Sequence, residues 1–306
     1  MSAESDKPVL IVGSMAFDDL ALPSGEFRDV VGGAATYSAM AASLFARPRI
    51  VAVVGEDFPA SVLTDLEARN VDTTGIERAA GKTFRWAGRY AQNLASRETL
   101  TTELNVFADF RPKLPPSYRD SSVVLLANIQ PELQLEVLDQ VHAPKFVAAD
   151  TMNLWIDIER PALERVIKRV QAMVINDEEL RQFAGEHNIK RAAQAILSLG
   201  PERLIVKRGE YGAMLFDADG IFFVPAFPLE DEVDPTGAGD TFAGALVGQL
   251  AQLGTVDGGT TRRALLTAAT VASYCVEGVG MARVRNLTLK DVDRRLNELR
   301  SLVHVE

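Results

Sequence analysis

The 306-residue sequence contains a single cysteine, only 7% aromatic residues and no surplus of positive charge. The lone Cys275 excludes an intrachain disulfide framework and indicates a reducing compartment, and its apolar neighbours favour a buried, unreactive thiol. The formal net charge of -10 argues against nucleic acid as a partner, because contacts along a phosphate backbone require a basic face. An anionic cofactor needs only a local site, so that class of ligand stays open.

Long hydrophobic runs are also absent. The acidic start MSAESDKPVLIVG has too short an apolar stretch for a signal peptide, and no segment approaches the roughly 20 apolar residues of a membrane span. We therefore expect a cytoplasmic protein without a membrane partner.

Three common ligand motifs are missing. No GxGxxG follows a strand, which excludes the dinucleotide fingerprint. The stretch GIERAAGKT, residues 75–83, has five residues between its glycines where a P-loop has four, and an alternating β pattern follows it. His142, His187 and His304 share no metal-ligand spacing with one another or with Cys275, so we expect no metal site built only from protein ligands.

The sequence does contain a regular alternation of short apolar runs and helical patterns. A chain of this length with 47% hydrophobic and 24% charged residues suits one large α/β domain over residues 1–306. The alternation predicts a doubly wound, mainly parallel sheet with helices on both faces. The predicted strands are 9–13, 50–55, 122–128, 145–150, 172–176 and 203–209, and the predicted helices are 34–46, 58–70, 131–141, 189–200, 238–253, 260–277 and 289–302.

Two stretches, residues 17–31 and 83–107, interrupt this alternation. They carry β-forming residues at alternate positions, so we predict two antiparallel ribbons that together form a small lid. The exposed edges of such ribbons favour a homodimer formed through the lid. The second ribbon holds five basic and aromatic residues: Arg85, Trp86, Arg89, Tyr90 and Arg97. These residues would clasp a substrate or, as the equal alternative, form a solvated basic edge.

The stretch DPTGAGDTFAGAL begins at Asp234 and runs into a predicted helix. The N–H groups of the first helical turn have no intrahelical partner, and the helix dipole places about half a positive charge there. Gly237 and Gly239 remove side chains that would block close approach, so this turn can wrap a phosphate oxygen. Asp240 then lies beside the anion, where it can accept a proton from an attacking hydroxyl. A helix start with a favourable acidic residue is the alternative.

This stretch resembles the C-terminal signature of the ribokinase-like (PfkB) carbohydrate kinases at each defining position. VGGAATYSAMAASLFA is similar to their N-terminal signature, and GSMAFDD, VVGEDF, DTMNLW, INDEE and VKRGEYG follow in the family's order along nearly the whole chain. The resemblance implies a ribokinase-like fold and transfer of the γ-phosphoryl group of ATP, carried with Mg²⁺, to a hydroxyl of a small-molecule sugar or nucleoside. A phosphosugar kinase and a non-catalytic relative that senses sugars or nucleotides are the alternatives.

The resemblance also implies roles for the glycine-rich motif. Asp240 would be the catalytic base, and a potassium site near Asp234 and Thr236 is a further implication. The anion hole for the transferring phosphoryl group would consist of three backbone amides: Gly237, Ala238 and Gly239.

On the acceptor side, the resemblance implies that Asp18 hydrogen-bonds substrate hydroxyls. A turn-forming role for Asp18, or the use of Asp19 in its place, is the alternative from the residues alone. Gly32 and Gly33 would bring the substrate against the backbone, unless they form only a tight turn into a helix. Many family members have an asparagine four residues after this pair, whereas here Tyr37 occupies that substrate-site position.

For the nucleotide side, Asn176 and Glu179 match the family's N-x-x-E motif, which orders magnesium and phosphates through water. The same spacing is that of a capping box at a helix start. Lys207 and Gly209 match a segment that contacts nucleotide phosphates, and Asn153 is a further nucleotide-side candidate; a solvated lysine and a turn residue are the alternatives. The adenine pocket is expected near residues 268–280.

Overall fold

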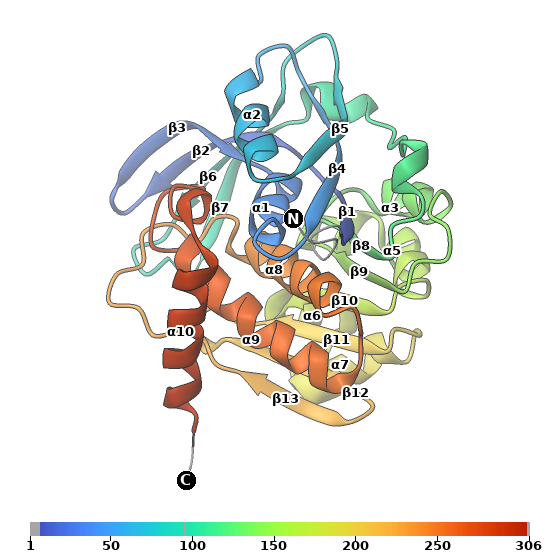
Figure 1. Ribbon diagram of the computed structural model, residues 1–306, viewed down its shortest axis with the longest axis vertical. Helices are drawn as coiled ribbons and strands as arrows, with labels where there is room; N and C mark the ends of the chain where they lie inside the picture. The colour runs from blue at the N-terminus through green and yellow to red at the C-terminus, as the bar shows by residue number, and fades with distance from the viewer. Residues whose placement is uncertain (1–6, 95, 305–306) are drawn as a thin grey trace.

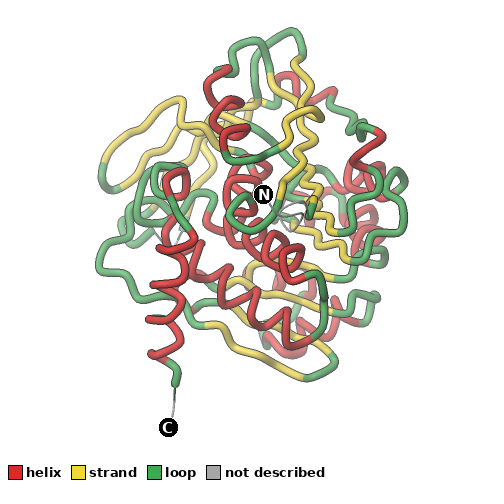
Figure 2. Tube along the Cα trace, viewed as in Figure 1, coloured by secondary structure: helices red, strands yellow, loops and turns green. Residues whose placement is uncertain are grey.

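The computed structural model describes residues 7–94 and 96–304, which are built around a nine-stranded sheet (Figures 1 and 2). The strand order is β13-β12-β11-β10-β9-β8-β1-β4-β5, and all neighbours pair in parallel except at the edge formed by β12 and β13. The strands are β1 (Pro8–Val12), β4 (Arg47–Val54), β5 (Asp72–Arg78), β8 (Val123–Leu126), β9 (Phe146–Asp150), β10 (Ala172–Asn176), β11 (Arg203–Lys207), β12 (Ala213–Asp217) and β13 (Gly220–Val224).

Helices cover both faces of this sheet, because its strands are apolar on both sides. Successive strand residues point to opposite faces, so Ile11 packs into one hydrophobic cluster and Val12 into the other. The first cluster includes residues of α1, α8 and α9, and the second includes residues of α3, α5, α6 and α7. The helices are α1 (Ala34–Ala42), α2 (Ala60–Ala68), α3 (Pro131–Leu138), α4 (Asn153–Ile158), α5 (Arg160–Ile167), α6 (Asp177–Ala184), α7 (Ile189–Leu197), α8 (Ala238–Leu253), α9 (Gly258–Cys275) and α10 (Leu289–Leu302).

The predicted doubly wound, mainly parallel architecture is confirmed. Each of the six predicted strands is present with ends shifted by at most a few residues, and α8 and α10 have the predicted bounds. The pattern did not predict β5, β12, β13, α4 or α5 as separate elements. The residues that imitate a P-loop begin inside β5, where Gly75 pairs with Val51 of β4.

A second sheet has the order β3-β2-β6-β7, and we refer to it as the lid sheet. It consists of β2 (Ala16–Leu22), β3 (Gly25–Gly32), β6 (Phe84–Tyr90) and β7 (Arg97–Glu103). The two predicted ribbons are antiparallel hairpins, but they join through a parallel pair, β2 and β6, into one sheet.

The second ribbon is shorter than predicted. Its strand β7 ends at Glu103, and Asn105–Asp109 forms a 3₁₀ helix. The reason is aromatic packing: the Phe107 ring stacks between Phe84 and Phe110, with centroid separations of 5.5 and 5.7 Å. The seven residues of β7 are all exposed at the sheet's edge. Dimer formation through this edge stays a prediction.

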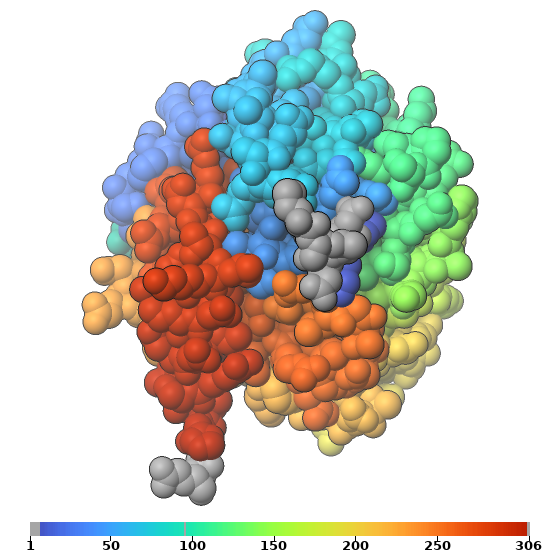
Figure 3. Space-filling model, in the orientation of Figure 1, coloured from blue at the N-terminus to red at the C-terminus, as the bar shows by residue number. Residues whose placement is uncertain are grey.

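The C-terminal helix α10 lies on the surface of the molecule (Figure 3). Its first turn has a capping box between Thr288 and Asp291, and its Arg295 lies 3.5 Å from the ring centroid of Tyr274 on α9. In the ranges that the structure describes, no helix combines the length and apolar character needed to cross a membrane.

Candidate active site

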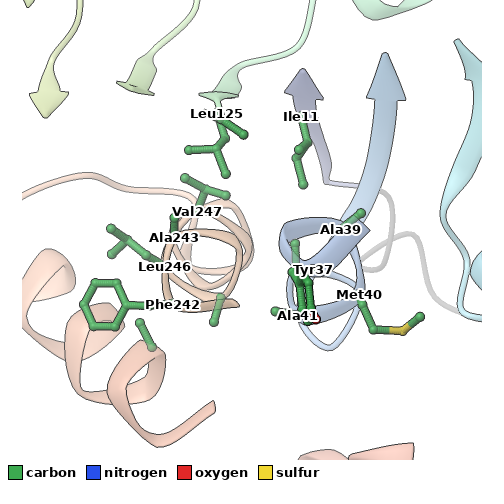
Figure 4. Packing of buried hydrophobic residues seen from close by; sticks show 14 of the residues in the cluster. Ile11, Tyr37, Ala39, Met40, Ala41, Leu125, Phe242, Ala243, Leu246 and Val247 are labelled. Carbon is green, nitrogen blue, oxygen red and sulfur yellow. The ribbon is translucent and has the colours of Figure 1, made fainter. Parts of the chain in front are cut away.

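The start of helix α8 is positioned by its close packing against α1 (Figure 4). Gly244 faces the backbone of α1 so closely that a Cβ there would lie 2.1 Å from the carbonyl oxygen of Ser38. At Gly248, one turn later, a Cβ would lie 2.8 Å from the Cα of Ala42. The Ser38 hydroxyl also donates to the carbonyl of Asp240 at 2.9 Å. These contacts fix α8, including its first turn, relative to α1.

The turn before α8 requires glycine at position 237. Gly237 has a left-handed backbone with φ 74°, and a Cβ there would lie 2.4 Å from the Cε1 and Cζ atoms of Tyr37. Tyr37 is only 1% exposed, and its hydroxyl has no hydrogen-bond partner among the described residues. The expected substrate-site position 37 thus holds a core ring that supports the glycine turn.

The three expected anion-hole amides are not equivalent. The Ala238 amide already donates to the carbonyl of Pro235 at 3.2 Å, whereas no hydrogen bond from the Gly237 or Gly239 amide is found within the described ranges. A Cβ at Gly239 would lie 3.0 Å from the Nζ atom of Lys207, so the lysine ammonium approaches this same turn. The helix start therefore combines two available N–H groups with a nearby positive charge.

Asp240 is a partly buried carboxylate in the first turn of α8. Burial and, less strongly, the negative charge of Asp150 raise its pKa to about 7, against the opposing positive charges of Lys207 and Arg97. A carboxylate with a near-neutral pKa is suited to accepting a proton at physiological pH.

Lys207 at the end of β11 forms an ion pair with Asp150 at the end of β9, with a separation of 3.0 Å between Nζ and Oδ2. Burial lowers the pKa of Lys207, but the carboxylates of Asp150, Glu179 and Asp240 outweigh burial and raise it. The ammonium therefore stays charged at neutral pH. Asp150 was not predicted as a site residue, although it ends a buried strand as Lys207 does.

Glu179 and Asn176 form the predicted capping box at the start of α6. The Glu179 amide donates to Asn176 Oδ1 at 2.8 Å, and the Asn176 amide donates to Glu179 Oε2 at 2.9 Å. Glu179 is 4% exposed, and burial with the nearby charge of Asp150 raises its pKa to about 7, against the effect of Lys207. The cap thus also belongs to the charged cluster around Lys207.

The expected acceptor residue Asp18 lies on β2, in the lid sheet, and is 5% exposed. Burial and the charges of Asp234 and Asp240 raise its pKa to about 8. A Cβ at Gly32 would lie 1.9 Å from Asp18 Oδ2, which explains glycine there. The alternative Asp19 serves instead in the β2–β3 hairpin, where its Oδ1 accepts from the Asp29 amide. Of the two acids, Asp18 is the one near Asp240.

The second glycine of the pair, Gly33, precedes α1 with φ 93°. A Cβ at this position would lie 2.5 Å from the carbonyl oxygen of Ser14, so the chain turns tightly against the end of β1. This is the tight turn into a helix that we gave as the alternative to substrate contact.

Two expected nucleotide-side residues lie outside the charged cluster. Gly209 is exposed and has φ 53°, and the space around it is open. Asn153 begins α4, and its Nδ2 donates to Gln182 Oε1 on α6 at 2.7 Å. The side chain of Asn153 therefore joins two helices in this structure.

Asp234 is fully buried, and both of its carboxylate oxygens accept backbone N–H groups. Oδ1 accepts from Thr236 at 2.9 Å and Oδ2 from Gly280 at 2.8 Å. The Cys275 thiol lies 3.6 Å from the carbonyl of Thr236, and burial raises its pKa to about 12, as expected for an unreactive thiol. Asp234 thus ties the glycine-rich turn to the segment after α9; the potassium site here stays a prediction.

A cavity of about 470 Å³ lies elsewhere on the protein. Of its lining, only Glu277 belongs to the stretch 268–280 in which we expect the adenine pocket, and none of the clustered carboxylates Asp18, Asp150 and Asp240 contributes. The cavity is therefore distinct from the charged cluster.

Comparisons with known proteins identify the family of this chain. Residues 7–286 match the model of the pfkB family carbohydrate kinases. The cytidine kinase of Thermococcus kodakarensis is 29% identical over 246 residues, which cover 78% of this chain and 87% of that protein. Among solved structures, the nucleoside kinase of Burkholderia thailandensis in complex with inosine has a TM-score of 0.80 at 19% identity, covering 95% of this chain and 97% of that one. A putative ribokinase II from E. coli in complex with ATP and Mg²⁺ has a TM-score of 0.78 at 22% identity, covering 96% and 99%. The chain belongs to the pfkB family of carbohydrate kinases and is a phosphotransferase with an alcohol group as acceptor.

Proposed function

We propose that this protein uses ATP to phosphorylate a hydroxyl of a nucleoside or sugar, with Asp240 as the general base. The observation that carries the proposal is the position of Asp240: it is a partly buried carboxylate with a pKa of about 7, one residue from the free amide of Gly239. A proton acceptor with a near-neutral pKa beside an anion-binding turn is what attack of an alcohol on phosphorus requires.

The residues around Asp240 fall into an acceptor side and a phosphate side. On the acceptor side, Asp18 has a pKa of about 8, so at neutral pH its carboxyl is largely protonated and can both donate to and accept from a hydroxyl. On the phosphate side, Lys207 is charged and approaches the start of α8. Asp240 lies close enough to both Asp18 and Lys207 for their charges to interact.

The residues present fit Mg-ATP. The amides of Gly237 and Gly239 have no hydrogen-bond partner within the described ranges and are open to a phosphate oxygen, and Lys207 would balance the phosphate charge. Asn176 and Glu179 would hold the waters of the magnesium ion, and Gly209 would contact the nucleotide from the end of β11. Bound Mg-ATP supplies the phosphoryl group and a divalent charge that neutralises it.

The chain's own contribution would be orientation, charge stabilisation and removal of one proton. Asp18 would orient the acceptor so that one hydroxyl oxygen faces the γ-phosphorus. As the new O–P bond forms and the bond to ADP breaks, the hydroxyl proton would pass to a carboxylate oxygen of Asp240. The amides of Gly237 and Gly239, with Lys207, would stabilise the charge on the transferring group.

A panel assay of ADP release tests this function. Purified protein with Mg-ATP is mixed with nucleosides, free sugars or phosphosugars, and both ADP and the phosphorylated acceptor are quantified, with an acceptor-free reaction as the control. We expect equimolar ADP and phosphorylated product with a nucleoside or sugar. A sensing protein would instead be stabilised thermally by one of these ligands while forming no ADP. That result would overturn the proposal.

A further inference from the structure

One face of the lid sheet carries an arginine toward the proposed site. Asp18 pairs with Trp86 and Tyr90 pairs with Arg97 across neighbouring strands. Because side chains on a strand alternate between faces, Trp86 and Tyr90, four residues apart on β6, share one face. Direct cross-strand partners share a face as well, so Asp18 and Arg97 face the same space.

This face of the lid sheet packs against the glycine-rich loop. The Thr236 hydroxyl lies 2.9 Å from the Tyr90 hydroxyl, and both residues are buried. Tyr90 also belongs to a hydrophobic cluster with Leu20 and Leu22, and Val279 packs against that cluster. Arg97, directly opposite Tyr90, is therefore held over the loop that leads into α8.

The Trp86 ring supports the arginine. The guanidinium carbon of Arg97 lies 5.5 Å from the centroid of that ring. The ring itself lies against Gly88, where a Cβ would come within 2.1 Å of it. Its Nε1 donates to Thr99 of β7 at 3.3 Å. An arginine stacked on a fixed ring keeps its N–H groups available at the edge of the stack.

The positive charge of Arg97 acts on acidic groups from three separate elements. It lowers the pKa of Asp18 on β2, of Glu179 on α6 and of Asp240 on α8, in each case against burial. Asp18 lies on the acceptor side and Glu179 on the phosphate side of Asp240. Lys207, the other cation that acts on Glu179 and Asp240, forms an ion pair with Asp150. Arg97, although exposed on β7, is thus close enough to Asp18, Glu179 and Asp240 for its charge to act on all three.

We propose that Arg97 is a further catalytic residue, which contacts the transferring phosphoryl group from the lid side, opposite the amides of Gly237 and Gly239. This inference rests on the proposed function. A planar guanidinium can bind two phosphoryl oxygens at once, and its charge offsets the negative charge of the group as it passes between acceptor and ADP. The lid sheet then serves to bring Arg97 to the reacting atoms as well as to cover the acceptor.

Kinetics of Arg97→Gln test this role, with Arg89→Gln as the matched control. Arg89 lies one residue before Tyr90 on β6, so it faces the other side of the sheet, where it is exposed and pairs with Glu98 at 3.5 Å. Arg89 thus belongs to the solvated basic edge that we gave as the alternative to a substrate clasp. We expect Arg97→Gln to lower kcat about 10²-fold or more with an uncharged acceptor, and Arg89→Gln to leave kcat within about twofold. Equal kcat values in the two variants would overturn the inference.

Binding of a phosphoryl mimic gives a second measurement. Wild type and Arg97→Gln are titrated with Mg-ADP alone and with Mg-ADP plus aluminium fluoride, in the presence of acceptor. In the wild type, we expect aluminium fluoride to tighten ADP binding. In Arg97→Gln, this gain in affinity should be at least about tenfold smaller, while the affinity for ADP alone is unchanged. An undiminished gain would contradict contact with the transferring group.

Two other outcomes distinguish failure of this inference from failure of the proposed function. Failure of the wild type to phosphorylate any acceptor would remove the proposed function itself. If the wild type is active and Arg97→Gln raises only the KM for a phosphosugar, the arginine binds a phosphate fixed on the acceptor, and our assignment is wrong. Arg97→Lys keeps the charge but not the planar fork, so we expect it to recover only part of the lost kcat.

Discussion

The ring of Tyr37 packs on the backbone of Gly237 so closely that a single added Cβ would lie 2.4 Å from its Cε1 and Cζ atoms. Because Gly237 also has φ 74°, Gly237→Ala should both strain the backbone and displace the ring. Gly254, which caps the other end of α8, has nearly the same φ of 76°, but a Cβ there would meet only the flexible end of Lys7, at 3.4 Å. Gly254→Ala is therefore a matched control for backbone strain alone.

We expect both variants to lose about 1–2 kcal/mol from the left-handed backbone, and Gly237→Ala to lose about 1–3 kcal/mol more from overpacking. Denaturant unfolding measures both. Only Gly237→Ala should also lose phosphoryl transfer, because it alone displaces the anion-binding turn. Similar stability and activity in the two variants would show that the Tyr37 contact does not position this turn.

Tyr37→Phe removes a buried hydroxyl that has no partner in the described part of the chain. Leaving such a group unsatisfied costs about 1–3 kcal/mol, so the variant should be as stable as the wild type or more stable. The acceptor KM should be unchanged if the tyrosine only supports the turn. A KM that rises tenfold would show instead that the hydroxyl binds the acceptor.

Tyr90→Phe removes the hydrogen bond between the lid sheet and Thr236 but retains the ring in its cluster. We expect a modest loss of stability, about 0.5–1.5 kcal/mol, and faster hydrogen exchange confined to residues 84–103. The acceptor KM should rise, because the lid face that carries Asp18 and Arg97 is held less firmly, whereas the affinity for ATP should change little. Equal weakening for ATP and acceptor would contradict the assignment of this sheet as an acceptor lid.

The buried acids make stability depend on pH. The pKa values of Asp18, Glu179 and Asp240 in the folded protein are about 8, 7 and 7, all above the ordinary values of 3.8, 4.5 and 3.8. The folded state therefore binds more protons than the unfolded state between about pH 4 and pH 8. Their stabilising contribution is fully present below pH 4 and is lost as pH rises through 7 to 8.

Asp18→Asn should remove one of these groups. In the absence of nucleotide, we expect the wild type to lose stability from pH 6 to pH 8.5, and Asp18→Asn to lose clearly less, as measured by urea unfolding at each pH. The Asp18 carboxyl is surrounded by Asp234, Asp240, Asp19 and Arg97, so the asparagine also relieves repulsion among the acids. Asp139→Asn, at a side chain 69% exposed, is the control and should keep the wild-type slope. Equal slopes of unfolding free energy against pH in all three proteins would contradict the raised pKa of Asp18.

The parallel sheet and the turn at Gly237 could be predicted from the sequence, because apolar strand runs and a glycine-rich helix start are local patterns. The contact of Lys207 with Asp150 could not, since Asp150 ends β9, Lys207 ends β11, and Glu179 follows β10 at the start of α6, so that the three meet only through the sheet order β9-β10-β11.

Local sequence patterns also could not predict the length of the second ribbon or the burial of Tyr37. The ribbon's end depends on the stacking of Phe107 between Phe84 and Phe110, and the burial of Tyr37 depends on the contact of α1 with α8. Both are tertiary contacts between segments far apart in the sequence. The register that puts Asp18 and Arg97 on the same face of the lid sheet likewise needs the parallel pairing of β2 with β6, which the two predicted ribbons did not include.

The single-turnover rate of Asp240→Asn tests the central claim most directly. Asparagine keeps the size of the side chain and removes the proton acceptor, while Ser38 still holds the backbone carbonyl of this residue. With Mg-ATP and acceptor both bound, and the chemical step followed by rapid quench, we predict a rate about 10²- to 10⁴-fold below that of the wild type, with nucleotide affinity retained or slightly higher. A variant that keeps more than about a tenth of the wild-type chemical rate would contradict Asp240 as the general base and leave DPTGAGD as an anion-binding helix start only.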